Sequence, residues 1–352
     1  MKKTILYLLL FSGILYFFPS ESCAQWLSQP SGTTATLGAV SFSSTQIGTA
    51  VGALGTILRT TNGGVSWEQQ ISGVTLDLFG AHFVDTNTGA ATGFLGTILR
   101  TSDGGSHWTA QTSGTSNFLA SIFFVDESHG YAVGDAGTIL HTTNGGLSWT
   151  PQVSTTTRGL SSVCFVSDSL GIVVGSNGTV LRTTNAGATW TSQTSGTTDF
   201  LSSVSFGDVN TVYAVGLNGT VLKSTNGGSN WIGQVSGTSS YLTGVSFGNA
   251  ETGIVVGANG TILRTTNGGV QWSPQSSGTT AQLNGVVFVS TDTGTAVGSG
   301  GVILHTTNGA TVTGVKLLDE KVRAFSLELD YPNPFNGSTT IGFIYLGDRG
   351  SV

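Results

Sequence analysis

The sequence predicts an all-β fold, a seven-bladed β-propeller made of four-stranded blades of 41 residues. Three observations support this prediction: tryptophans recur every 41 residues, short β-type segments alternate with turn residues, and the first segment matches what the last repeat lacks. Only 9% of the 352 residues are charged and 53 are glycine, which argues against a disordered or coiled-coil chain. The formal net charge of −6 argues against a nucleic-acid-binding surface.

The repeat interval is constant along most of the chain. Successive tryptophans from Trp26 to Trp272 lie 41 residues apart, and columns of leucine, phenylalanine and glycine keep the same step. Because no unit contains an insertion, we expect equivalent blades. The seven units start at Leu37, Leu78, Leu119, Leu160, Leu201, Leu242 and Leu283.

Each unit contains four short segments typical of strands. In the first unit these are residues 37–42, 50–51, 56–60 and the segment from 67 to 70, separated by Gly, Asn and Ser. Three units place an Asn-Gly pair between the second and third segments, for example Asn177-Gly178. This pair accepts positive φ at both positions, so we expect a two-residue type I′ hairpin there.

The ring is expected to close through the N-terminal segment. The seventh unit lacks its tryptophan, since Thr313 stands at that position, whereas Trp26 has no unit in front of it. We therefore expect residues 25–36 to supply the outer strand of the last blade, because pairing there satisfies an otherwise bare sheet edge. The predicted propeller spans residues 25–313.

The turn before the tryptophan of six units carries the Asp-box pattern: Ser or Thr, any residue, Asp or Asn, any residue, Gly, any two residues, Trp. The Asn or Asp side chain can bond the backbone of its own turn, and the tryptophan buries a large ring between neighbouring sheets. We interpret these residues as structural. They are Asn62, Trp67, Asp103, Trp108, Asn144, Trp149, Asn185, Trp190, Asn226, Trp231, Asn267 and Trp272.

The N-terminus has the features of a secretory signal peptide. Lys2 and Lys3 precede an apolar stretch over residues 5–18, and the small residues Ser22 and Ala24 fit cleavage before residue 25. We therefore expect residues 1–24 to be a signal peptide that exports the chain through the inner membrane. Its removal would leave Cys164 as the single cysteine, which we expect to be a small core residue.

A second export feature lies at the other end. The segment Tyr331-Pro-Asn-Pro-Phe-Asn-Gly-Ser-Thr-Thr-Ile341 resembles the start of the C-terminal sorting domain of the type IX secretion system. We expect a linker at 314–323 and an incomplete sorting domain at 324–352, because the family domain continues well past this point. The resemblance implies contact with the export machinery and a cell-surface or extracellular location, or the periplasm if the tail is incomplete.

The repeated pattern Gly-x-x-Gly-Thr-Ile-Leu-Arg-Thr-Thr-Asn-Gly-Gly-x-x-Trp resembles the photosystem II assembly and stability factor family of seven-bladed propellers. The resemblance covers about residues 25–310. It implies a non-enzymatic scaffold that binds a folding membrane-protein partner, and an arginine-rich patch has been assigned to that contact. We take over the architecture and the idea of a binding scaffold, but not the partner.

One column of basic residues, the basic belt, is a candidate binding site. Five of the six Lys and Arg residues between positions 37 and 310 belong to it. It could bind an anionic protein surface or glycan. The alternative, which repetition in every blade favours, is that each side chain packs on a neighbouring ring or bonds backbone carbonyls. The belt is Arg59, Arg100, His141, Arg182, Lys223, Arg264 and His305.

A second candidate is the loop from each outer strand to the next blade, because its residues vary while the frame repeats. Phe118, Arg158, Phe200 and Tyr241 occupy these loops. Their side chains could stack on sugars or on apolar side chains of a partner. The alternative is that the rings tuck against the next inner strand.

The sequence favours a binding protein over an enzyme. A propeller glycosidase needs two positioned carboxylates, whereas Asp85, Asp126 and Asp208 share one turn column and are turn formers first. The histidines lack metal-ligand spacing, so we expect no metal and no cofactor. We predict a monomeric exported scaffold with a protein or polysaccharide partner. The alternative is a carbohydrate-active enzyme, such as a propeller glycoside hydrolase or a sialidase-like protein.

Overall fold

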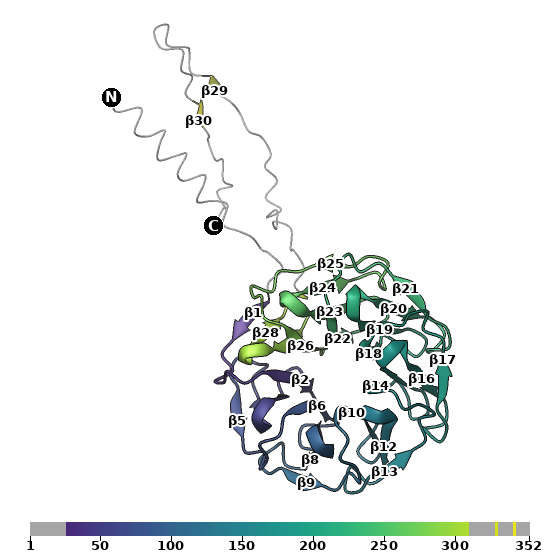
Figure 1. Cartoon of the computed structure of the whole chain (residues 1–352). Helices are drawn as coiled ribbons and strands as arrows, with labels where there is room; N and C mark the ends of the chain where they lie inside the picture. Colours follow the sequence, from purple (N-terminus) through teal and green to yellow (C-terminus); the bar gives the residue numbers. More distant parts are fainter. Residues whose placement is uncertain (1–25, 310–327, 330–340, 343–352) are drawn as a thin grey trace, which may run out of the picture. The chain divides into compact units, whose positions relative to one another are not determined.

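The computed structural model describes residues 26–309, 328–329 and 341–342. Residues 26–309 form seven four-stranded antiparallel sheets arranged in a ring, which confirms the predicted seven-bladed β-propeller (Figure 1). The predicted signal peptide at 1–24, the linker at 314–323 and most of the sorting domain at 324–352 lie outside the described residues, so they stay predictions.

Each blade contains an inner, a second, a third and an outer strand in that order. The inner strands are β2 (Leu37–Phe42), β6 (Leu78–Phe83), β10 (Leu119–Phe124), β14 (Leu160–Phe165), β18 (Leu201–Phe206), β22 (Leu242–Phe247) and β26 (Leu283–Phe288). The second strands are β3 (Gly48–Gly52), β7 (Gly89–Gly93), β11 (Gly130–Gly134), β15 (Gly171–Gly175), β19 (Val212–Gly216), β23 (Gly253–Gly257) and β27 (Gly294–Gly298).

A three-residue 3-10 turn connects the second strand of each blade to the third. These turns are η1 (Ala53–Gly55), η2 (Phe94–Gly96), η3 (Asp135–Gly137), η4 (Ser176–Gly178), η5 (Leu217–Gly219), η6 (Ala258–Gly260) and η7 (Ser299–Gly301). The third strands are β4 (Ile57–Thr60), β8 (Ile98–Thr101), β12 (Thr138–Thr142), β16 (Val180–Thr183), β20 (Val221–Ser224), β24 (Ile262–Thr265) and β28 (Ile303–Thr306).

The outer strands are the shortest. They are β5 (Glu68–Gln70), β9 (Thr109–Gln111), β13 (Thr150–Gln152), β17 (Thr191–Gln193), β21 (Ile232–Gln234), β25 (Ser273–Pro274) and β1 (Leu27–Gln29). Short outer strands limit pairing of the exposed sheet edges with other chains.

The core lies between adjacent blades. Every residue of each second strand is buried, which fits strands covered on both faces. Between the seventh and first blades, Leu58 and Trp67 pack in one cluster with Val297 and Ile303. Each interface therefore buries apolar side chains from two blades that are consecutive around the ring.

The predicted closure is confirmed. Strand β1 pairs antiparallel with β28, with Leu27 opposite His305 and Gln29 opposite Ile303. Trp26, only 3% exposed, stacks on Phe288 with ring centroids 6.5 Å apart. The first strand of the chain thus completes the last blade and covers an edge of β28 that would otherwise be unpaired.

The predicted type I′ turn is present at Asn177-Gly178, where Thr179 N–H donates to Ser176 O (3.2 Å), but the connection holds one residue more than a two-residue hairpin. Asn177 and Gly178 have the expected positive φ values of 53° and 63°, but the connection is the three-residue turn η4. The N–H of Ser176 donates to Gly159 O in the loop before β14 and so does not pair with β16. Thr179 O accepts its hydrogen bond from Gly175 N–H rather than from Ser176 N–H. The loop at the start of each blade therefore helps to shape its turn.

The ring has two faces, which we name by their turns. The hairpin face carries the 3-10 turns and the loops between blades, since Ala53 N–H bonds Thr36 O. The Asp-box face carries the Asp-boxes and the turns between inner and second strands, since Gly63 N–H bonds Gln46 O.

The chain divides into two units, residues 1–312 and 313–352. In the second unit, β29 (Glu328–Leu329) pairs antiparallel with β30 (Ile341–Gly342). Among the described residues, none belongs to a helix that is long and apolar enough to cross a membrane.

Candidate functional site

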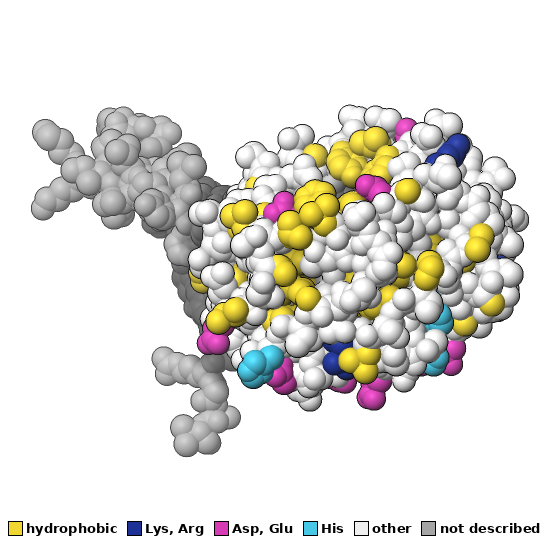
Figure 2. All heavy atoms as spheres, turned by 60° about the horizontal axis from the view of Figure 1, so that its bottom comes forward, with side chains coloured by type: hydrophobic (Ala, Val, Ile, Leu, Met, Phe, Trp, Pro, Cys, Tyr) yellow, Lys and Arg dark blue, Asp and Glu magenta, His cyan; other side chains and the backbone are white. Residues whose placement is uncertain are grey.

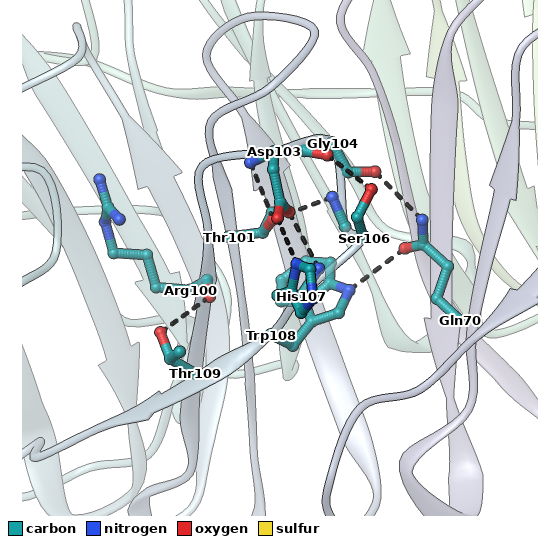
Figure 3. A network of polar contacts seen from close by, with 10 residues as sticks. Gln70, Arg100, Thr101, Asp103, Gly104, Ser106, His107, Trp108 and Thr109 are labelled. Atoms are coloured by element: carbon teal, nitrogen blue, oxygen red, sulfur yellow. Dashed lines mark hydrogen bonds and ion pairs between the residues drawn. The ribbon is translucent and has the colours of Figure 1, made fainter.

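The Asp-box of the second blade shows how these turns are built (Figure 3). Asp103 Oδ1 accepts a hydrogen bond from the backbone N–H of His107 (2.9 Å), and Oδ2 lies 2.6 Å from His107 Nδ1. The backbone N–H and the imidazole of His107 lower the pKa of Asp103 to about 2. Thr101 Oγ1 also donates to Asp103, so the carboxylate holds its own turn.

The same box joins two blades. Trp108 Nε1 donates to Gln70 Oε1 of the first blade (3.1 Å), and Gln70 Nε2 donates to Gly104 O (3.1 Å). In the first blade, Asn62 Oδ1 accepts from Ser66 N–H (3.0 Å). These contacts support the structural role that the pattern predicts.

The basic belt lies on the third strands near the Asp-box face. Arg100 Nε, Arg182 Nε and Lys223 Nζ each donate to the first glycine carbonyl of the next Asp-box. The acceptors are Gly145 O (2.6 Å), Gly227 O (2.7 Å) and Gly268 O (2.6 Å). A charged donor that is partly shielded from water makes a stronger bond than a neutral one, so these residues tie consecutive blades together.

The remaining belt residues make other contacts at the interfaces between blades. Arg59 is buried, bonds Thr86 O and lies 4.8 Å from the centre of the Phe83 ring, and burial lowers the pKa of its guanidinium. Arg264 is also buried, with its guanidinium 3.8 Å from Asp292.

Both belt histidines are half-buried and contact their own blades. The His141 ring stacks on Tyr131, with centroids 4.6 Å apart, and His305 Nδ1 lies 3.0 Å from Thr295 Oγ1. The structure therefore distributes the belt over separate interfaces and does not gather it into one exposed surface. A role of the belt in binding a partner stays a prediction.

The four candidate loop residues lie on the hairpin face. Phe118 is half-buried against Phe79, with ring centroids 4.8 Å apart, and Phe200 meets Tyr241 edge to face at 6.4 Å. Burial raises the pKa of Tyr241. Arg158 is exposed, donates to Asn177 O (3.0 Å) and lines an open groove of 850 Å³ beside η4 and β17. Their binding role also stays a prediction.

The carboxylates that the sequence assigns to turns do hold turns. Asp85, Asp126 and Asp208 each accept two backbone N–H bonds from residues two and three positions later. Their pKa values are lowered by these bonds, against an opposing effect of burial. Cys164 is buried on β14, and burial raises the pKa of its thiol, as expected for an unreactive core residue.

Sequence reasoning missed two features. Leu54 and Leu95 occupy the left-handed position of η1 and η2, where η4, η5 and η6 carry asparagine. The signal was available, because the same column of the repeat changes from Asn to Leu in two adjacent blades. His82 was also missed: it occupies an inner-strand position where the other blades have no histidine, and burial lowers its pKa to about 4.

Together, the ring of equal blades and the repeated turns define a seven-bladed propeller of the BNR type. The sequence family described as photosynthesis system II assembly factor YCF48 matches residues 71–152, 111–192, 152–236 and 234–324. The chain belongs to this family. The comparison with curated proteins finds no match.

Solved structures share the fold at low sequence identity. YCF48 bound to D1 peptide has a TM-score of 0.69 at 19% identity, with 80% of this chain and 95% of that chain covered. YCF48 from Cyanidioschyzon merolae has a TM-score of 0.67 at 20% identity, covering 80% and 98%. The GH74 enzyme of Niastella koreensis has a TM-score of 0.65 at 16% identity, covering 79% and 53%.

Proposed function

We propose that this chain is an exported, non-catalytic propeller that acts as a scaffold for a protein partner. The observation that carries the proposal is the family match, which extends over most of the blades. A YCF48 structure holds a bound D1 peptide, so a ring of this kind can receive a polypeptide segment. The identity of the partner is not carried over, because the sequences are only 19% identical.

The contacts of the carboxylates favour binding over catalysis. A glycosidase places two carboxyl groups on either side of one bond. Here Asp85, Asp126 and Asp208 hold equivalent turns of three blades, each bonded to the backbone of its own loop. The likeness to the GH74 enzyme, at 16% identity, extends to the fold alone.

The proposed place of action is the cell surface or the extracellular space. Residues 1–24 and the Tyr331–Ile341 segment support this proposal through their likeness to export signals. Cell fractionation of the source organism tests it, and recovery of the chain from the cytoplasm would contradict it.

The functional test exposes one purified sample of the protein to three arrays. The first carries peptides that tile the exported and membrane proteins of the source organism, the second carries glycans, and the third contains chromogenic glycosides. We expect saturable binding to a subset of the peptides. If the protein hydrolyses a glycoside and loses this activity when a single Asp or Glu is changed, the scaffold proposal is wrong and the protein is an enzyme. Binding to glycans alone would replace the protein partner with a polysaccharide.

A further inference from the structure

Apolar side chains gather on the hairpin face of the first two blades and of the loop that leads to the third. We call this group the apolar patch, which consists of Leu54, Phe79, Phe94, Leu95 and Phe118. The three phenylalanine rings contact one another, with centroids 4.8 to 5.1 Å apart. Leu54, Leu95 and Phe94 remain 73%, 66% and 42% exposed. The rings thus form a supported base beside two leucines that face solvent.

The two leucines are held in an unfavourable backbone conformation. Leu54 has φ of 56° and Leu95 has φ of 53°, in the left-handed region. This region disfavours residues with a Cβ, and asparagine tolerates it better than leucine. The equivalent positions of the other five blades carry Asn177, Asn218 and Asn259, together with Ala136 and Gly300. Leucine at these sites therefore both strains the backbone and exposes apolar surface, a combination typical of a functional surface.

Carboxylates lie beside the patch. Asp77 Oδ1 accepts a hydrogen bond from Leu54 N–H (2.8 Å), which fixes the strained residue and brings a negative charge next to it. Asp135 is exposed at the first position of η3, in the blade that follows Phe118. Figure 2 shows hydrophobic side chains gathered at the upper edge of the view with acidic side chains next to them. Arg158, the exposed basic residue on this face, donates to Asn177 O in the fourth blade, so Asp77 and Asp135 are the charges nearest the patch, which therefore suits a ligand that is apolar and positively charged.

We propose that the apolar patch binds a protein segment in which leucine or aromatic side chains stand next to a lysine or arginine. The apolar side chains would cover Leu54, Leu95 and the Phe94 ring, and the cation would face Asp77 or Asp135. This inference rests on the proposed scaffold function and names its site and the chemistry of its partner.

The experiment measures binding of three fluorescent 12-residue peptides by anisotropy. The first alternates Leu, Phe and Arg with serine spacers, the second has Glu in place of Arg, and the third has Ser in place of Leu and Phe. We expect the first peptide to bind at least about tenfold more tightly than either of the others. Equal binding of all three peptides would overturn the proposal.

The decisive variant is the double substitution Leu54→Asn, Leu95→Asn, which installs the residues found in three other blades. We expect it to weaken the first peptide at least about tenfold and to raise the melting temperature by about 2 °C or more, because strain is relieved. Loss of binding with a more stable fold cannot come from unfolding. Leu147→Ser, on the Asp-box face where Leu147 is 59% exposed, is the control and should bind normally.

The charge is tested separately by Asp77→Asn, Asp135→Asn. Asparagine at position 77 can still accept the Leu54 bond, so the turn is kept while the charge is removed. We expect the preference for Arg over Glu peptides to fall about fivefold or more; an unchanged preference contradicts the charge argument. If the tiling peptides bind the wild-type protein and the Leu54→Asn, Leu95→Asn variant equally well, the apolar patch is not the binding site, but the proposed scaffold function is retained. If no tiling peptide binds, both proposals fail.

Discussion

One histidine should make the ring sensitive to mild acid, and His82→Ser should remove that sensitivity. His82 lies on β6, and its Nδ1 accepts a hydrogen bond from Phe124 N–H of the next blade (3.3 Å). The imidazole also packs against Phe123, with ring centroids 4.6 Å apart. Protonation of Nδ1 would replace this bond with two opposed donors. Burial accordingly lowers the pKa of His82 from 6.5 to about 4.

The size of the effect follows from the two pKa values. Because the pKa is lower in the folded chain, the unfolded chain takes up the proton first as the pH falls. The stabilisation is complete above about pH 6.5 and is lost as the pH falls towards 4. At pH 5 the loss in the free energy of unfolding amounts to about 2 kcal/mol, at about 1.4 kcal/mol per pH unit.

Serine is the matched replacement at this position. Ser41 and Ser205 accept the equivalent bonds from Phe83 and Phe247. The substitution can therefore keep the contact between blades while it removes the titrating group. The smaller side chain also changes the free energy of unfolding by an amount that does not depend on pH. This amount cancels when the free energies of the same variant at two pH values are subtracted.

The assay is urea denaturation of the wild type and His82→Ser at pH 7.5 and pH 5.0. The difference between pH values should be about 2 kcal/mol smaller in the variant. Leu27→Ala, at a residue that is 51% exposed and carries no titrating group, is the control and should retain the acid sensitivity of the wild type. An equal loss of stability in wild type and His82→Ser would refute the assignment.

Three further predictions can be checked by the same denaturation assay at neutral pH. Trp26→Ala should lower the free energy of unfolding by about 3–5 kcal/mol, whereas Leu27→Ala on the exposed side of β1 should change it by less than about 0.5 kcal/mol; similar effects would contradict closure through Trp26. Thr155→Gly should raise the free energy of unfolding by about 0.5–1 kcal/mol, because Thr155 has φ of 62° where the other six blades have glycine. A less stable variant would show that contacts of the threonine side chain offset the backbone strain. Arg100→Ala should cost about 1–2 kcal/mol through loss of the bond to Gly145 O, and no change would mean that water replaces this bond fully.

The sequence alone was sufficient for the architecture because the repeat is long and uninterrupted. The tryptophan spacing determined the number of blades, and the unmatched Trp26 segment determined how they close, which the β1–β28 pairing confirms. The turn η4 was not predictable in detail, because its extra residue depends on a bond from Ser176 to Gly159 in another loop. At Asn177-Gly178 local propensity agrees with the positive φ values, whereas contacts between loops determine the turn length.

The candidate sites were less predictable than the fold. The belt column was visible in the sequence, but its contacts depend on the neighbour: Arg100 reaches a glycine carbonyl, whereas Arg59 reaches Thr86 O and a phenylalanine ring. The pKa of His82 could not be inferred, because it arises from packing between blades. The position of a residue in the repeat places its Cα atom. It does not show which blade supplies the group that its side chain contacts.

Function in such a ring is best sought where the repeat is broken at a cost in stability. Backbone strain alone does not mark a functional position, since Ala136 of η3 and Ala186 of the fourth Asp-box also have left-handed φ values, of 54° and 55°. Leu54 and Leu95 differ, because each replaces a residue suited to left-handed φ with one that is not, and both expose apolar surface. Two adjacent blades share this departure on one face beside Asp77. Strain, exposure and adjacency together distinguish this patch from the equally variable loops of the remaining blades.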